Sequence, residues 1–110
     1  MKAYVGTWRI TEMDEWDNEY INMETKAYIQ IDKKGLGNFQ FALVMGSIDG
    51  EVEEFGGEQR FAFTWEGNAE DDQVSGSGWL KLEKKDELTG RIKFHSGDSS
   101  LFKARRKRVS

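Results

Sequence analysis

Hydrophobic and polar residues alternate along most of this 110-residue chain, with the period of two that is typical of strands in a half-buried sheet. Between residues 59 and 65, for example, Phe61, Phe63 and Trp65 share one face, while Ala62 and Thr64 lie on the other. The same pattern predicts eight strands: Tyr4–Met13, Lys26–Lys33, Asn38–Met45, Glu51–Phe55, Gln59–Trp65, Val74–Glu83, Leu88–His95 and Ser100–Arg108. Most connections are too short for the crossover that a parallel pair requires, so neighbouring strands should be antiparallel.

The segments between the predicted strands are polar or rich in glycine. Asp49-Gly50 is a strong signal for a two-residue hairpin turn, here between the third and fourth strands. Gly67–Gln73 is polar and acidic, and we interpret it as a loop. In Asp14–Thr25, the longest non-strand segment, apolar residues recur at spacings of three and four, which predicts one short helix after the N-cap candidate Asp14.

A meander of eight strands hides its two edges by closing into a barrel or by folding into a sandwich. Gly6, Gly76, Gly78 and Gly90 all fall on the apolar face of their strands, where a missing side chain relieves crowding and lets a strand bend. We therefore expect one all-β domain over residues 1–110, an antiparallel meander of about eight strands closed into a small barrel.

The first predicted strand contains Gly6-Thr7-Trp8-Arg9-Ile10, which resembles the Gly-x-Trp signature at the start of lipocalins and of the wider calycin superfamily. With its meander and its basic last strand, the chain is similar to small bacterial domains that form a minimal lipocalin-like barrel. The resemblance implies that Trp8 closes one end of the core and that a basic residue of the last strand packs across its ring. Arg105 and Arg106 both qualify for this role, and the sequence leaves the choice open.

The composition excludes several kinds of chemistry. The chain has no cysteine and a single histidine, His95, which excludes disulfides, thiolate-bound zinc, iron–sulfur clusters, thiol catalysis and a multi-histidine metal site within one chain. We expect neither a cofactor nor a metal. No apolar run approaches the ~20 residues of a membrane-spanning helix. The first residues lack the apolar segment of a secretory signal, so we expect a cytoplasmic protein without a membrane partner.

Charge is distributed unevenly along the chain. The net charge is −4, and Lys103–Arg108 contributes five positive charges, so the remaining residues carry −9. An acidic surface of this kind repels phosphates at long range. We interpret the basic run as a solvated edge strand and expect no nucleic-acid partner.

Large aromatic residues gather on the inward face of the predicted strands. They are Trp8, Phe39, Phe41, Phe61, Phe63, Trp65 and Phe94. These rings either fill a small core or line a pocket for an apolar or aromatic ligand. The second interpretation gives these candidate ligand-binding residues at the barrel mouth: Trp8, Glu12, Trp16, Phe41, Phe63 and Trp65. Glu12 shares the face of Trp8 and Ile10 in this register, so it would point to the mouth, where it is exposed, paired or a polar anchor for a ligand.

Three functions stay open at this point. The leading hypothesis is a non-catalytic binding module that takes a small apolar or aromatic ligand at the barrel mouth. The alternative is a protein-interaction or homodimeric module that uses an exposed sheet face with Trp79 and Tyr28, or the acidic loop. A hydrolase with a carboxylate pair, such as Glu12 and Asp14, is the third. No catalytic residue is assigned, because His95 lies in no Ser–His–Asp arrangement that the sequence reveals.

Overall fold

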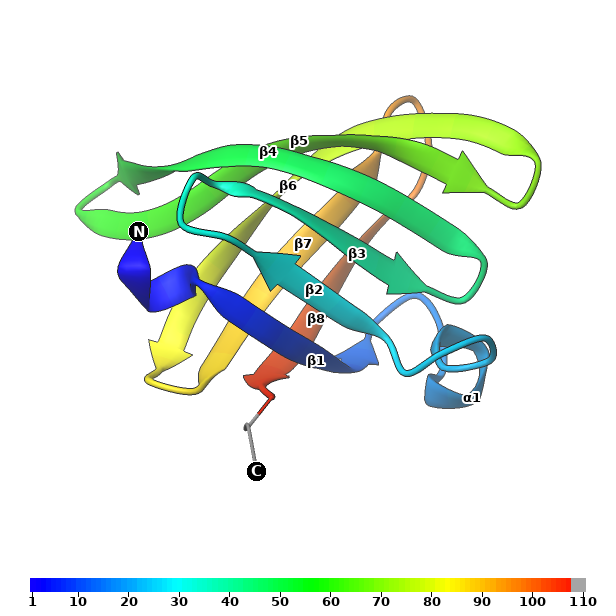
Figure 1. The fold of residues 1–110 in the computed structure, drawn as a ribbon, viewed down its shortest axis with the longest axis horizontal. Coiled ribbons are helices and arrows are strands. Elements are labelled where there is room, and N and C mark those ends of the chain that lie inside the picture. The colour runs from blue at the N-terminus through cyan, green and yellow to red at the C-terminus, as the bar shows by residue number, and fades with distance from the viewer. Residues whose placement is uncertain (108–110) are drawn as a thin grey trace.

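A computed structural model describes residues 1–107, and Arg108, the end of the last predicted strand, lies outside the described residues. Within residues 1–107 the chain forms eight strands: β1 (Gly6–Met13), β2 (Tyr28–Ile31), β3 (Leu36–Phe41), β4 (Val44–Phe55), β5 (Glu58–Ala69), β6 (Asp72–Lys84), β7 (Glu87–Phe94) and β8 (Ser99–Arg106). A 3-10 turn, η1 (Lys2–Tyr4), precedes β1, and one helical turn, α1 (Asn18–Ile21), lies between β1 and β2. The predicted all-β class is confirmed (Figure 1).

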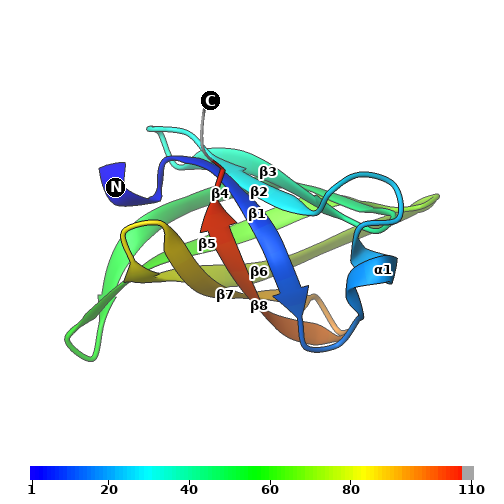
Figure 2. The same ribbon diagram turned by 90° about the horizontal axis from the view of Figure 1, so that it is seen from below.

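The strands follow one another around a closed barrel, which confirms both the predicted antiparallel meander and its closure. Each strand pairs with its neighbours in sequence, and β1 also pairs with β8, placing Arg9 opposite Arg105 and Ile10 opposite Ala104. Figure 2 shows β1 and β8 side by side at this seam. Pairing the first strand with the last removes the two edges that an open eight-stranded sheet would expose.

The alternating strand directions give the barrel two different ends (Figure 1). The N-terminal end carries η1 and the connections 32–35, 56–57 and 85–86. The α1 end carries the connections 14–27, 42–43, 70–71 and 95–98. The connection 14–27, which we call the α1 loop, contains the helical turn.

The interior is filled by the aromatic side chains that the alternation predicted to point inward. Trp8, Phe39, Phe41, Phe61, Phe63 and Trp65 are all buried. Inward glycines make room for these rings: a Cβ atom on Gly78 would lie 2.5 Å from the Phe63 ring, and one on Gly46 would lie 2.5 Å from the Phe39 ring. The rings therefore lie against bare backbone, which is how so many aromatic residues fit inside a small barrel.

The predicted hairpin turn at Asp49-Gly50 is wrong, because β4 runs through both residues. The chain turns earlier, at positions 42 and 43, where Ala42 has a positive φ of 51°. Gly50 has a packing role instead: a Cβ atom there would lie 2.7 Å from Cβ of Phe63 and 2.8 Å from the Phe61 ring. The local sequence alone does not distinguish a glycine that makes room for neighbouring rings from a glycine that forms a turn.

The predicted loop at Gly67–Gln73 is also wrong. β5 extends to Ala69 and β6 begins at Asp72, so only two residues turn the chain, with Glu70 at a φ of 55°. Acidic residues in this segment belong to a long, exposed hairpin. Among the described residues, no helix is long and apolar enough to cross a membrane.

Candidate functional site

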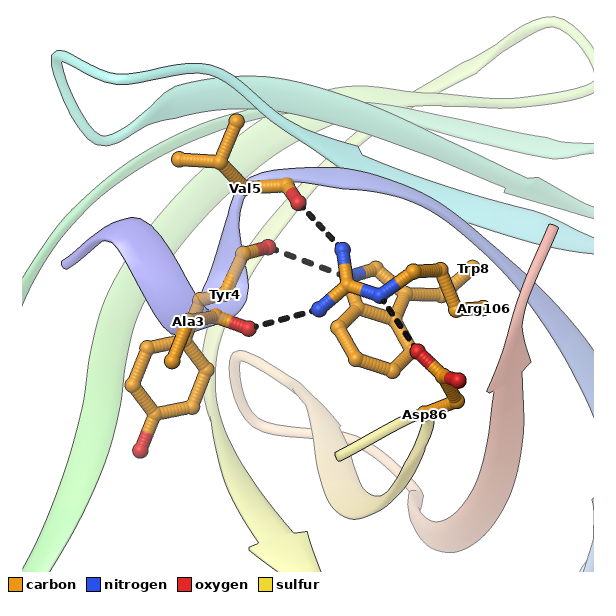
Figure 3. Close-up of polar contacts among 6 residues, drawn as sticks. All are labelled: Ala3, Tyr4, Val5, Trp8, Asp86 and Arg106. Atoms are coloured by element: carbon orange, nitrogen blue, oxygen red, sulfur yellow. Dashed lines mark hydrogen bonds and ion pairs between the residues drawn. The ribbon is translucent and has the colours of Figure 1, made fainter. Parts of the chain in front are cut away.

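The N-terminal end of the barrel is closed by Trp8 and Arg106 (Figure 3). The guanidinium carbon of Arg106 lies 4.2 Å from the centroid of the Trp8 ring, which is fully buried. The guanidinium also donates hydrogen bonds to the Val5 carbonyl, to the Ala3 carbonyl at 2.9 Å and to the Asp86 carboxylate at 3.0 Å. Arg106 therefore makes the contact that the lipocalin resemblance implies, and its other interactions tie η1 and the β6–β7 turn to the last strand.

Tyr4 completes this end of the barrel. Its carbonyl accepts a hydrogen bond from the Trp8 indole nitrogen at 3.0 Å, and its hydroxyl donates to the Gln59 carbonyl at 3.3 Å. Burial raises the pKa of the Tyr4 hydroxyl, because desolvation disfavours the phenolate. Arg105, the other basic candidate, is exposed and lies 3.9 Å from the Glu87 carboxylate. The N-terminal end is thus held by hydrogen bonds and ionic contacts.

The α1 end is closed differently, by a group of rings that we call the aromatic cluster: Trp16, Phe39, Phe41, Trp65 and Phe94. Trp16 is half-buried and stacks on Phe41 with 5.2 Å between centroids. Phe94 meets Trp65 edge-on at 5.2 Å and Trp16 edge-on at 6.4 Å. Trp16 thus forms the outer layer of the cluster, and the exposed Tyr20 ring lies next to it with 6.4 Å between centroids.

Hydrogen bonds within the α1 loop and to the β3–β4 turn hold the segment around Trp16 in place. Asp17 caps α1, because its carboxylate accepts a hydrogen bond from the Tyr20 N–H at 2.9 Å. The Ile21 carbonyl accepts from the Ala42 N–H at 2.8 Å and so joins the loop to the β3–β4 turn. Two apolar side chains of the loop stay exposed: Tyr20 at 45% and Met23 at 54%.

The predicted N-cap, Asp14, has another role. Its carboxylate accepts hydrogen bonds from the Ser100 hydroxyl at 2.7 Å and from the Leu101 N–H at 2.8 Å. Asp14 therefore fastens the start of the α1 loop to β8, and the N-cap lies three residues later, at Asp17, with the helix beginning at Asn18.

Three of the six predicted site residues come together in the structure: Trp16, Phe41 and Trp65 belong to the aromatic cluster. Trp8 lies at the opposite end of the barrel, beneath Arg106. Phe63 lies between the two ends, next to Phe61, with 6.0 Å between ring centroids.

The predicted position of Glu12 is wrong. The pairing of β1 with β8 shifts its register between Ile10 and Glu12, and this irregularity turns Met13 into the core in place of Glu12. Glu12 is exposed on the outside, 3.6 Å from the Lys103 ammonium. A bulge inverts the inside and outside of every residue that follows, and alternation alone does not reveal it.

A second feature, which the sequence reading missed, is a groove of about 650 Å³ on the outside of β4–β7. Its polar lining consists of Ser47, Asp49, Thr64, Glu66, Ser75, Ser77, Lys93 and His95. We call the groove lined by these eight residues the outer groove. An adjoining hollow of about 640 Å³ shares Ser47, Glu66, Ser75 and His95 with it. Seven of the eight residues fall on the outward face of their strands, and the eighth, His95, lies in the turn after β7. Only the strand register brings them together.

Trp79 and Tyr28, the two outward rings, differ in their surroundings. The Arg60 guanidinium lies 4.4 Å from the centroid of the Trp79 ring, so one face of that ring is covered. Tyr28 is half-buried in β2. Within residues 1–107, no group of three or more acidic, cysteine or histidine side chains is arranged to hold a metal ion.

Comparison of the chain with protein-family models, with curated proteins and with solved structures finds no match. The geometry of the barrel and its surface is therefore the basis for inferring its function.

Proposed function

We propose that this barrel is a non-catalytic, lipocalin-like binding module that takes a small apolar or aromatic ligand at its α1 end. The observation that carries the proposal is the difference between the two ends. Arg106 closes the N-terminal end with charge-assisted hydrogen bonds, whereas the rings of Trp16, Phe41 and Phe94 close the α1 end by apolar contact. An apolar molecule replaces apolar contacts at little cost, but it cannot replace the partners of a guanidinium.

The proposed binding step exchanges one ring for another. Trp16 is half-buried, and its loop is joined to the barrel on either side by the Asp14 and Ile21 hydrogen bonds. Movement of this loop uncovers the Phe41 face, and a flat ligand then stacks where the indole was. The exchange conserves buried apolar area, and the exposed Tyr20 and Met23 side chains offer further contact at the rim.

The chemistry of the aromatic cluster indicates an uncharged ligand. Trp65 already donates its indole N–H to the Lys93 carbonyl at 3.2 Å, so the cluster has little hydrogen-bonding capacity left. A charged group placed among these rings would lose its hydration without gaining a partner. We therefore assign the site to neutral molecules of one or two rings.

A fluorescence titration with the neutral dye N-phenyl-1-naphthylamine tests the proposal. We expect a saturable rise in emission and an increase in Tm, because a ligand that binds the folded state stabilises it. In the variant Trp16→Ala the dye should bind about tenfold more tightly, because it no longer competes with the indole ring. In the matched variant Trp79→Ala, on the outer face, the affinity should not change.

Two results would contradict the proposal. One is an emission that rises without saturation while Tm falls, which indicates binding to unfolded chains. The other is an equal response of the Trp16→Ala and Trp79→Ala variants, which would place the dye away from the α1 end.

A further inference from the structure

We infer that the outer groove is a second binding site, independent of the α1 end, for a neutral polyhydroxylated ligand such as a short oligosaccharide. The groove lies on the outside of the barrel wall, where Trp65 is the one member of the aromatic cluster that contributes to its lining. Eight polar side chains line it together with Leu36, Ile48, Trp65 and Gly76, so it offers many more hydrogen-bonding groups than the apolar site.

The strand register arranges the outer groove as two parallel rows of side chains. One row is Asp49, Thr64, Ser77 and Lys93, which are direct cross-strand partners. The other is Ser47, Glu66 and Ser75, continued by His95, whose N–H donates to the Ser75 carbonyl at 2.7 Å. Neighbouring strands lie about 4.8 Å apart, so each row presents polar groups over roughly 14 Å. An extended molecule with many hydroxyl groups fits such a grid.

The hydrogen-bonding groups of the outer groove are unused by the protein. Across residues 1–107, none of its eight side chains makes a hydrogen bond or an ion pair with another protein group. Elsewhere on the outer surface the pairs do form: Lys81 with Glu58 at 3.2 Å, Thr89 with Glu83 at 2.9 Å, and Arg91 with Ser99 at 3.0 Å. Polar groups at cross-strand spacing usually interact with one another. In the groove they do not, so their hydrogen-bonding atoms can bind a molecule from outside.

The small net charge of the groove favours a neutral ligand over a highly charged one. Asp49 and Glu66 against Lys93 leave one negative charge in excess among these side chains, which disfavours a polyanion and is too small to hold a polycation. The chemistry of the groups matches hydroxyls: carboxylates accept hydrogen bonds, the ammonium donates them, and the Ser and Thr hydroxyls do both. The volume of about 650 Å³ falls in the usual range of small-molecule sites.

Amide NMR of the isotope-labelled chain tests this inference, with maltotriose, cellotriose and N-acetylated chitotriose as probes. We expect at least one of them to cause saturable shifts in β4–β7, around Ser75, Ser77 and His95, with Kd below about 10 mM. These shifts should persist between low and physiological salt, because a neutral ligand is not screened. The Trp16 indole signal should stay in place, which separates this site from the α1 end.

Variants of the groove complete the test. Ser77→Arg fills the floor and should weaken binding at least tenfold, a loss of about 1.4 kcal/mol. Gln59→Arg, which adds the same charge at the exposed start of β5, should leave binding unchanged. If Ser77→Arg disturbs the fold, Thr64→Val removes one hydroxyl at nearly constant volume and should weaken binding several-fold.

Three results would overturn the inference: no saturable shift with any probe, shifts that vanish at physiological salt, or equal effects of Ser77→Arg and Gln59→Arg. None of these results bears on the dye titration at the α1 end, so the two proposals fail separately.

Discussion

At the scale of single residues, small side chains decide how the large ones pack. The inward glycines of β4 and β6 lie directly under aromatic rings, so a glycine in this chain indicates a ring nearby as often as a turn. Gly50 illustrates the difference, since it lies within a strand against Phe61 and Phe63. The sequence pattern predicted the inward face of Gly76 and Gly78 in β6, but it assigned Gly50 to a turn and did not reveal which ring each glycine would receive.

Gly78→Ala tests this packing. The added Cβ atom would lie 2.5 Å from the Phe63 ring, so the ring or the strand must shift, and we expect a loss of stability. Overpacking of this kind costs about 1–3 kcal/mol. Gly97→Ala is the control, because the nearest atom to its Cβ, in Phe94, is 3.2 Å away at an exposed turn. Urea unfolding of both variants measures the difference, and equal midpoints would contradict the packing argument.

At the scale of elements, α1 is a single turn whose stability depends on its cap and on its neighbours. An isolated helix of this length does not persist in water. Two hydrogen bonds stabilise this turn: the Tyr20 N–H donates to the Asp17 carboxylate, and the Ala42 N–H donates to the Ile21 carbonyl. A helical turn in this segment was predictable from the spacing of its apolar residues, but its cap was not, because Asp14 is instead bound by β8.

Asp17→Ala should loosen the α1 loop while the barrel stays folded. Loss of an N-cap costs about 0.5–2 kcal/mol, and here this cost falls on the helical turn that follows Trp16 in the α1 loop. We expect faster hydrogen exchange at Ile21 and Ala42. Glu24→Ala removes the same charge from the same loop without removing a cap. Unaltered exchange in the Asp17→Ala variant would show that the loop does not depend on its cap.

At the scale of the whole molecule, the barrel joins the two ends of the chain. β1 pairs with β8, and Arg106 binds Trp8, Asp86 and two carbonyls of the N-terminal turn. The two ends of the barrel therefore differ: polar contacts hold the N-terminal end closed, and aromatic rings cover the α1 end. Part of the basic run at the end of the sequence has a structural role, because Arg106 closes the N-terminal end of the barrel.

Arg106→Met should destabilise the entire fold. The substitution keeps an unbranched side chain over Trp8 but removes the charge, and it leaves the Asp86 carboxylate and the Ala3 and Val5 carbonyls without this donor. We expect a loss of about 2–4 kcal/mol in the free energy of unfolding.

Arg105→Met is the matched control for this prediction. Its ion pair with Glu87 is exposed and spans 3.9 Å, and such pairs contribute about 0–1 kcal/mol. Chemical denaturation of both variants separates the two roles. A smaller loss for Arg106→Met than for Arg105→Met would contradict the assignment of Arg106 as the closing residue.

The sequence by itself determined the strand content, the inward face of the aromatic residues, the antiparallel order and the tendency to close. These follow from local alternation and short connections, which any segment reveals without its partners. Only the tertiary structure decided that Arg106 and not Arg105 covers Trp8, that Glu12 faces outward, and that eight polar side chains from β4–β7 and the turn after β7 line one groove. Each of these depends on register, and a shift of one residue, as at the β1 bulge, moves every later side chain to the other face.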